Sequence, residues 1–341
     1  MADSHTSETV LVTGGTGYLA GWVIAGLLQR GYRVRTTVRS LDRAQQVRDA
    51  VGEQAGGQAA ATIEFAVADL LDDDGWDEAA AGAAYVLHTA SPMPFGSGVD
   101  LVTTAREGTR RALGAAARAG VRRAVLTSSG VTADSGDPDT PATETMRTAP
   151  SGTPLRAYPD SKNLAERDAW DLAAATGLEL TAVLPTFMQG PMLGTPNRPG
   201  TVDIIRRLLA GRIPAVPNIG WNIVDVRDIA ELHILAMTSP AATGQRFLGS
   251  GTFLWYRDIA RILRERLPNE AAKVPTRAMP DIVVKLLARC NPQMAMLRPE
   301  LGRTRIVDSG KARTQLGWQT RPTEQTITDT ATALIAEPRQ G

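Results

Sequence analysis

Tyr158 and Lys162 lie four residues apart in the segment Tyr158-Pro159-Asp160-Ser161-Lys162, so they would share one face of a helix. A free phenol has a pKa of about 10, and a neighbouring ammonium group and a positively charged oxidised nicotinamide should both lower that value. We expect Tyr158 to donate a proton to a carbonyl oxygen while a hydride reaches the carbonyl carbon. Lys162 would adjust the acidity of the phenol and hold the ribose hydroxyls of a cofactor. Because proline is tolerated in the first turn of a helix, the helix should begin at or near Tyr158.

A serine pair supplies a second polar group for the same carbonyl oxygen. Ser128 and Ser129 end an apolar run at 124–128, and Ser129 is placed to donate a hydrogen bond there, with Ser128 as the alternative. A Tyr-x-x-x-Lys pair alone is a weak signal. Here it follows, in order, a glycine turn and the serine pair, and that order favours a catalytic site.

The glycine turn Thr13-Gly14-Gly15-Thr16-Gly17-Tyr18-Leu19-Ala20 lies between an apolar strand and a helix. In that context, small residues allow a tight turn, a close backbone approach to a pyrophosphate and close packing of helix on strand. The pyrophosphate would sit at the helix N-terminus, where free N–H groups point outward. Two spacings fit, one from Gly14 and one from Gly15. The residues predicted to bind the cofactor here are Thr13, Gly14, Thr16, Gly17, Tyr18 and Leu19.

The end of the second strand indicates which dinucleotide is bound. An NAD site usually has a carboxylate roughly 20 residues past the glycines. This chain has Arg39 there, with Arg43 nearby and Asp42 farther along the loop. A guanidinium fork suits a 2′-phosphate, so NADPH is favoured. Asp69, followed by Leu70, would bind the adenine amino group or cap its own loop.

Short apolar runs alternate with segments of helical periodicity from residue 9 onward, which predicts a parallel α/β sheet. We expect a Rossmann-type doubly wound sheet with a smaller C-terminal lobe. Residues 9–190 would form the NADP-binding domain, with 218–248 returning to it, and 191–217 and 249–336 would form the substrate lobe. Strands are expected at 9–13, 33–39, 63–68, 84–90, 124–128, 180–185 and near 222–226, helices at 99–118, 161–176 and 202–210, and a loop at 186–200.

These motifs, taken together and in order, resemble the extended short-chain dehydrogenases/reductases, in particular the group of dihydroflavonol 4-reductase, cinnamoyl-CoA reductase and microbial aldehyde/ketone reductases. The resemblance spans roughly residues 9 to 240. It rests on residues 13–20, Val38-Arg39, His88-Thr89-Ala90-Ser91-Pro92, Glu107-Gly108-Thr109, Thr127-Ser128-Ser129, Tyr158-x-x-Ser161-Lys162-x-Leu164-Ala165-Glu166, Leu184-Pro185-Thr186, Gly190-Pro191 and Val224-Asp225-Val226-Arg227-Asp228.

The resemblance implies a Ser129, Tyr158 and Lys162 triad and a bound NADPH, with Pro185 beside the nicotinamide. The predicted cofactor site is completed by Thr89, Ala90, Ser91, Thr127 and Thr186. The sequence departs from the group after the serines, where Gly130 and Val131 replace the usual alanine-glycine step. The proline-rich stretch between Gly130 and Tyr158 also differs from the plant enzymes.

The leading interpretation is therefore NADPH-dependent reduction of an aldehyde or ketone with an apolar or aromatic substituent. A nucleotide-sugar epimerase or dehydratase shares the fold and the Tyr/Lys pair, but dehydratases need additional acid-base groups beside the serine. A nonenzymatic NADP-binding regulator is the third interpretation, although such proteins can lose the proton donor that this chain keeps.

Composition limits the remaining possibilities. The 341 residues carry a net charge of +1, which gives no sign of a nucleic-acid or anionic-membrane partner. No apolar run reaches the roughly 18 residues of a membrane span, and the single cysteine, Cys290, is expected to be a packing residue. No histidine pair has metal-ligand spacing, so no metal is expected. We expect a cytoplasmic protein, possibly a homodimer.

Overall fold

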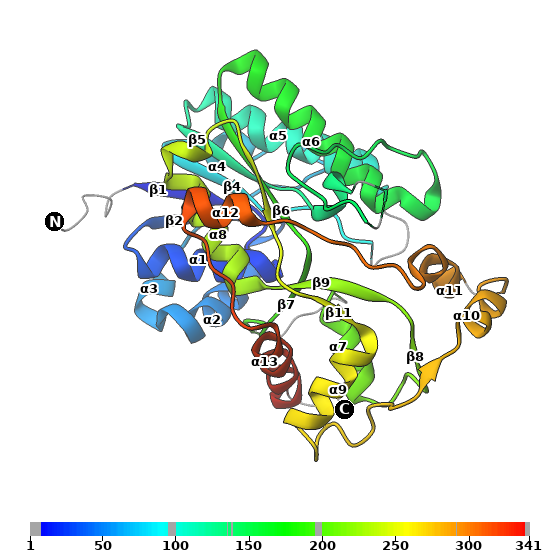
Figure 1. Ribbon diagram of the computed structural model, residues 1–341. Helices are drawn as coiled ribbons and strands as arrows, with labels where there is room; N and C mark the ends of the chain where they lie inside the picture. The colour runs from blue at the N-terminus through cyan, green and yellow to red at the C-terminus, as the bar shows by residue number, and fades with distance from the viewer. Residues whose placement is uncertain are drawn as a thin grey trace.

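A seven-stranded parallel sheet forms the centre of the molecule (Figure 1). The computed structural model describes residues 8–94, 100–134, 136–137, 139–194, 200–290 and 292–337. The strand order is β3-β2-β1-β4-β5-β6-β10, which reverses direction between β1 and β4. In open α/β sheets a ligand crevice forms at that reversal, at the carboxyl ends of the strands. The strands are β1 (Thr9–Val12), β2 (Arg33–Val38), β3 (Glu64–Val67), β4 (Tyr85–His88), β5 (Arg123–Thr127), β6 (Glu179–Pro185) and β10 (Arg246–Gly249).

Helices cover both faces of this sheet, as the doubly wound expectation requires (Figure 1). Side chains alternate along each strand, so Val10 and Val12 enter one core while Leu11 enters the other. The first core packs against α1 (Tyr18–Gln29), α2 (Ala44–Ala55), α3 (Gly57–Ala61) and α8 (Val226–Thr238). The second packs against α4 (Trp76–Ala80), α5 (Leu101–Arg118) and α6 (Ala157–Thr176).

A second lobe with its own apolar core lies beyond the carboxyl ends of the strands (Figure 1). Its sheets contain β7 (Phe187–Gln189), β9 (Gly220–Asp225) and β11 (Phe253–Trp255), with β8 (Val216–Pro217) paired to β12 (Ala278–Met279). Its helices are α7 (Asp203–Leu209), α9 (Tyr256–Arg266), α10 (Asp281–Leu287), α11 (Pro292–Leu297) and α13 (Thr323–Ala336). Single 3₁₀ turns are η1 (Leu41–Arg43), η2 (Gly130–Ala133), η3 (Pro154–Arg156), η4 (Pro240–Ala242) and η5 (Arg298–Glu300).

The chain crosses between the lobes more than once. Strand β10 belongs to the seven-stranded sheet, and helix α8 packs in the first core. Strand β9, just before α8, pairs in the small sheet instead. Helix α12 (Gly310–Leu316) and the buried Trp318 also pack against the first core. The domain boundaries expected from the sequence place residues 249–336 in the second lobe. The Trp318 Nε1–H donates to the carbonyl oxygen of Asp228 at 2.7 Å.

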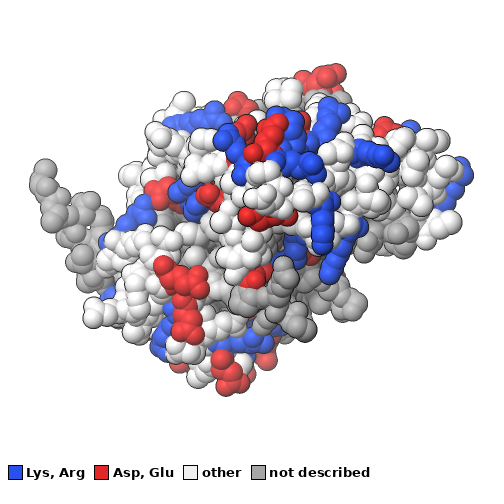
Figure 2. Space-filling model, turned by 90° about the horizontal axis from the view of Figure 1, so that it is seen from below, with Lys and Arg blue, Asp and Glu red and all other residues white. Residues whose placement is uncertain are grey.

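Several local expectations can be compared with the structure directly. Helix α6 begins at Ala157, so Pro159 lies in its first turn as expected. The segment read as a loop contains strand β7, and Cys290 is exposed rather than packed. Among the described residues, no helix is long and apolar enough to cross a membrane and no three potential ligands cluster for a metal. Positive and negative side chains are interspersed on the face shown in Figure 2.

Candidate active site

The glycine turn connects β1 to α1 at the point where the strand order reverses. Gly14 has a φ of 74°, and a Cβ there would lie 3.0 Å from the Cβ of Ala90. A Cβ on Gly15 would lie 2.5 Å from the Oγ1 of Thr36. Gly14 therefore provides both the unusual backbone conformation and the close approach of β1 to β4, while Gly15 lies against β2.

The N-terminus of α1 offers free backbone donors. Gly17 is its N-cap, and no side chain caps it. The Leu19 side chain is buried in the core, and Thr16 is exposed. The Tyr18 hydroxyl donates to the carbonyl oxygen of Gly190 at 2.8 Å, and burial raises the pKa of this phenol. Tyr18 thus ties the turn to the second lobe through its side chain, and the uncapped N–H groups suit an anionic pyrophosphate.

The Thr13 side chain joins the end of β1 to the end of β4 through hydrogen bonds. Its hydroxyl oxygen accepts from the N–H groups of Thr89 at 3.1 Å and Ala90 at 3.0 Å, and contacts the Nδ1 of His88 at 2.9 Å. With both lone pairs used, the hydroxyl must donate to Nδ1, so His88 carries its proton on Nε2. Burial, then the nearby Lys162 charge, lowers the pKa of His88 to about 3, so the ring is neutral. Thr89 and Ala90 therefore line this turn, and Ser91 follows them.

The expected adenosine-side residues lie at the ends of β2 and β3. Arg39 is exposed and makes no hydrogen bond or ion pair with any described residue. Arg43 is also exposed, and its Nη1 donates to Gln46 at 3.1 Å. Asp69 caps its own loop, since its Oδ1 accepts from the N–H of Leu71 at 2.9 Å. The Leu70 side chain packs against Gly108 of α5.

Tyr158 and Ser129 are brought together as the sequence predicts. Ser129 precedes η2 at the end of β5, and its side chain lies close enough to the half-buried Tyr158 phenol to lower the pKa of that group. The sequence predicts that an ammonium and an oxidised nicotinamide lower the Tyr158 pKa. In the chain itself, burial raises that pKa, and the nearby Ser129 side chain offsets only part of the rise. The phenol is therefore protonated near neutral pH.

Lys162 lies one helical turn beyond Tyr158 and is buried. Its Nζ donates to the carbonyl oxygen of Thr127 at 3.1 Å. Burial lowers the pKa of Lys162 to about 8, and the Glu166 carboxylate opposes that shift. Thr127 was predicted to bind the cofactor, and its hydroxyl contacts the Nε2 of His233 on α8 at 2.8 Å.

Ser128 faces a different partner from Ser129. Its hydroxyl donates to the buried carboxylate of Glu166, which also accepts from Thr132 at 2.9 Å. Ser129, not Ser128, thus lies beside the Tyr158 phenol. Glu166 was noted only within a motif, although its spacing from Lys162 repeats the Tyr158–Lys162 spacing and would have shown that all three share one helix face.

Pro185 ends β6, and Thr186 follows it beside Gly130. The N–H of Thr186 donates to the carbonyl oxygen of Gly249 at 2.9 Å, which fixes the strand end. A Cβ on Gly130 would lie 3.1 Å from the Cγ2 of Thr186, so glycine at 130 allows η2 to pack against this strand end.

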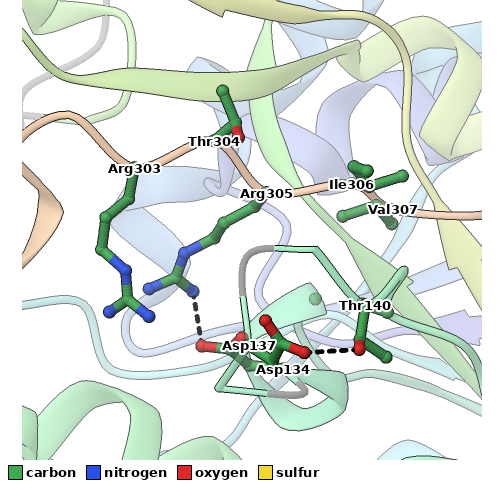
Figure 3. A pocket seen from close by; sticks show the side chains of 10 residues that line it. Asp134, Asp137, Thr140, Arg303, Thr304, Arg305, Ile306 and Val307 are labelled. Carbon is green, nitrogen blue, oxygen red and sulfur yellow. Dashed lines mark hydrogen bonds and ion pairs between the residues drawn. The ribbon is translucent and has the colours of Figure 1, made fainter.

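A hollow beside Gly130 was not predicted from the sequence (Figure 3). Residues 303–307 form one wall, and a bridge between Ala142 and Val307 joins it to the other. The other wall is formed by Asp134, Asp137, Thr140 and Ala142. Arg305 donates to Asp134 at 2.7 Å, and Arg303 donates to the carbonyl oxygen of Gly136 at 2.9 Å. The hollow is therefore lined by polar and charged groups as well as by the apolar Ile306 and Val307. Sequence spacing gave no signal for it, because its walls are about 170 residues apart in the chain.

Known proteins share these features. Residues 10–248 match the family described as "NAD dependent epimerase/dehydratase family". Cinnamoyl-CoA reductase 1 from Petunia hybrida is 35% identical over 281 residues, covering 80% of this chain and 81% of that protein. Tetraketide alpha-pyrone reductase 2 from Arabidopsis thaliana is 33% identical over 270 residues, covering 76% and 83%.

Solved structures have the same fold. The yeast methylglyoxal/isovaleraldehyde reductase Gre2, complexed with NADPH, covers 96% of this chain and 98% of its own, with a TM-score of 0.77 and 24% identity. With the family match spanning residues 10–248 and two reductases more than 30% identical, the chain belongs to the NAD-dependent epimerase/dehydratase family, as an extended short-chain dehydrogenase/reductase.

Proposed function

We propose that the chain is an NADPH-dependent carbonyl reductase that converts an aldehyde or ketone to the alcohol. The observation that carries the proposal is the proximity of Ser129 to a protonated, half-buried Tyr158, with the buried Lys162 one turn away on the same helix. This group lies at the carboxyl end of β5, two strands from the glycine turn.

The residues present fit a dinucleotide. The first turn of α1 has no capping side chain, and Gly14 leaves the space beside Ala90 that a Cβ would fill. Arg39 is exposed and has no partner among the described residues, so its guanidinium is free for a 2′-phosphate. The relative Gre2, which is complexed with NADPH, supports the same choice. When bound, NADPH supplies the hydride.

Each residue of the triad has a separate task in this proposal. Ser129 donates a hydrogen bond to the carbonyl oxygen of the substrate and holds the Tyr158 hydroxyl beside it. Tyr158 transfers its proton to that oxygen as negative charge develops there. Lys162, fixed by the Thr127 carbonyl, favours the phenolate that this transfer leaves behind.

The substrate is proposed to be a carbonyl compound with an extended organic substituent. The relatives include cinnamoyl-CoA reductases, a tetraketide alpha-pyrone reductase and anthocyanidin reductases. Gly130, the residue after Ser129, lines the hollow of Figure 3, and the polar end of such a substituent is proposed to reach Arg303 there. The apolar or aromatic part of the substituent would lie outside this hollow.

The family also contains epimerases and dehydratases, so the test must separate the reactions. NADPH oxidation is followed by absorbance with a panel of aliphatic and aromatic aldehydes and ketones. Nucleotide sugars are incubated separately with oxidised cofactor and their products are analysed by chromatography, because epimerisation and dehydration consume no net NADPH. We expect carbonyl-dependent oxidation and no turnover of the sugars. Turnover of the sugars alone would overturn the proposal, and NADPH binding without any turnover would favour a regulator.

A further inference from the structure

Glu166 is a charged residue in the catalytic region to which the proposed reaction gives no task. Its side chain is 4% exposed, and the side chain of its ion-pair partner Arg246 is 3% exposed, with Arg246 Nε 2.6 Å from Glu166 Oε1. The carboxylate also accepts from Ser128, from Thr132 at 2.9 Å and from Trp170 Nε1 at 3.2 Å. A buried ion pair costs desolvation free energy, so this one is not explained by stability alone.

Arg246 connects the pair to the chain around the active site. From strand β10, its Nη1 donates to the carbonyl oxygens of Glu144 at 2.8 Å and Met146 at 2.6 Å. Its Nη2 donates to the Thr132 hydroxyl at 2.7 Å, in the 3₁₀ turn that Ser129 begins. The pair thus holds α6, β10, the turn after the catalytic serine and the segment that follows Ala142 in the wall of the hollow of Figure 3.

Glu166 also faces Lys162. The two residues are one turn apart on α6 and line one small cavity together with His88, Thr127 and Ser128. Helix α5 contributes the uncharged Ala105 and Thr109 to this cavity, and β4 contributes the neutral His88. Among the described residues that line it, Glu166 is the only carboxylate.

We propose that Glu166 is a positioning residue that provides the counter-charge for the buried Lys162 ammonium and, through Ser128, fixes the turn that presents Ser129. Arg246 holds the carboxylate in place and ionised. The proposal rests on the proposed function for its catalytic meaning, but the electrostatic relation between the two side chains can be measured without any substrate.

The physical argument concerns the protonation of Lys162. Burial disfavours the ammonium form and brings its pKa to about 8, and Glu166 is the group that opposes this. The Glu166 pKa itself is lowered, because Arg246 and the hydrogen bonds from Ser128 and Thr132 outweigh the effect of burial. An ionised Glu166 therefore keeps Lys162 charged at neutral pH.

Two substitutions separate charge from shape. Glu166→Gln preserves the size of the side chain and removes the charge, whereas Glu166→Asp keeps the charge and shortens the side chain. If the negative charge of Glu166 is what matters, Glu166→Gln should lower the Lys162 pKa and Glu166→Asp should not. Glu179→Gln is the matched control, because it breaks another Arg–Glu pair, with the buried Arg123, at the amino end of the sheet.

The sequence makes a direct measurement practical. It contains four lysines, at 162, 273, 285 and 311, so lysine labelled with ¹³C at Cε gives four signals. Lys162→Met identifies the signal of Lys162, and a pH titration of the cofactor-free full chain then reports its pKa. We expect Glu166→Gln to lower this pKa by on the order of one pH unit. Glu166→Asp and Glu179→Gln should titrate like the wild type.

The titration results test the role of Glu166, and the activity results test the proposed function. An unchanged Lys162 titration in folded Glu166→Gln, or equal shifts in the Gln and Asp variants, would overturn it. If Glu166→Gln does not fold, the paired change Glu166→Gln with Arg246→Met removes both buried charges and must still lower the Lys162 pKa. A wild type that reduces no carbonyl would refute the proposed function and leave the titration result to stand. In an active enzyme, the alkaline limb of the rate should move with the titration.

Discussion

Burial dominates the acid–base state of the two groups proposed to carry the chemistry. It raises the pKa of Tyr158, so the phenol holds the proton that a reductase must donate. It lowers the pKa of Lys162 to about 8, so the ammonium is the group that titrates near physiological pH. The proton donor and its neighbouring charge therefore respond to pH in different ranges.

Carbonyl reduction should lose rate as pH rises through about 8, because Lys162 then loses the charge that favours the phenolate. The rate at saturating NADPH, measured across the neutral and alkaline range, tests this expectation. Lys162→Arg keeps its charge in that range and should lack the alkaline limb, at a lower overall rate. A wild-type rate that is flat until Tyr158 itself titrates would contradict the assignment.

Arg39→Ala should raise the Michaelis constant for NADPH by about tenfold or more and change that for NADH little, because only NADPH carries the 2′-phosphate. Arg33→Ala is the control, since Arg33 lies exposed at the other end of β2 and pairs with Glu64 at 3.4 Å. Equal effects of Arg39→Ala on both cofactors would remove the phosphate-binding role.

Sequence reasoning identified the residues whose spacing is local. Tyr158 and Lys162 are on one helix, so their four-residue spacing places them on the same face. Ser129 follows an apolar strand, so the end of that strand identified it. It did not find the Glu166–Arg246 pair or the hollow near Arg303, because both join segments far apart in the chain. It also did not anticipate that burial raises the Tyr158 pKa, since burial cannot be read from spacing.

At the scale of elements, the turn between β1 and α1 must satisfy backbone geometry and packing together. Gly14 takes a left-handed conformation and lies against Ala90 of the segment after β4. The apolar strands and the glycine turn were predictable because each follows from neighbouring residues. Strand β7 was not, because its pairing with the distant β9 overrides a proline- and glycine-rich context.

Gly14→Ala should weaken NADPH binding by about tenfold or more, because the added Cβ meets Ala90 and moves the turn away from the pyrophosphate. Gly82→Ala is matched in backbone, with a φ of 67° and no atom within 4 Å of the added Cβ. Both changes should lower the free energy of unfolding by about 1–2 kcal/mol. Calorimetric titration with NADPH compares them, and equal affinity in the two variants would contradict the role given to the turn.

At the scale of the molecule, the C-terminal part of the chain serves both lobes. Helix α13 packs in the second core, whereas α12 and Trp318 pack in the first. The division expected from the sequence treated 249–336 as one unit. It could not show that a buried tryptophan returns to the Rossmann core, because the partners of Trp318 precede it by about 90 residues.

Trp318→Ala should lower the free energy of unfolding of the whole chain by about 3–5 kcal/mol, because the side chain is 1% exposed and its indole N–H is hydrogen-bonded. Trp255→Ala, at a half-buried position in the second lobe, should cost clearly less. Urea unfolding followed by circular dichroism makes the comparison. Equal losses would show that Trp318 does not join the C-terminal segment to the first core.

The central claim is that Tyr158 supplies the proton for carbonyl reduction, and Tyr158→Phe tests it by removing one hydroxyl group. Steady-state NADPH oxidation with the best carbonyl substrate should fall by about 10²- to 10⁴-fold, with NADPH affinity retained. Tyr85→Phe, a buried tyrosine at the opposite end of the sheet, should keep wild-type turnover. Wild-type turnover by Tyr158→Phe would contradict the account.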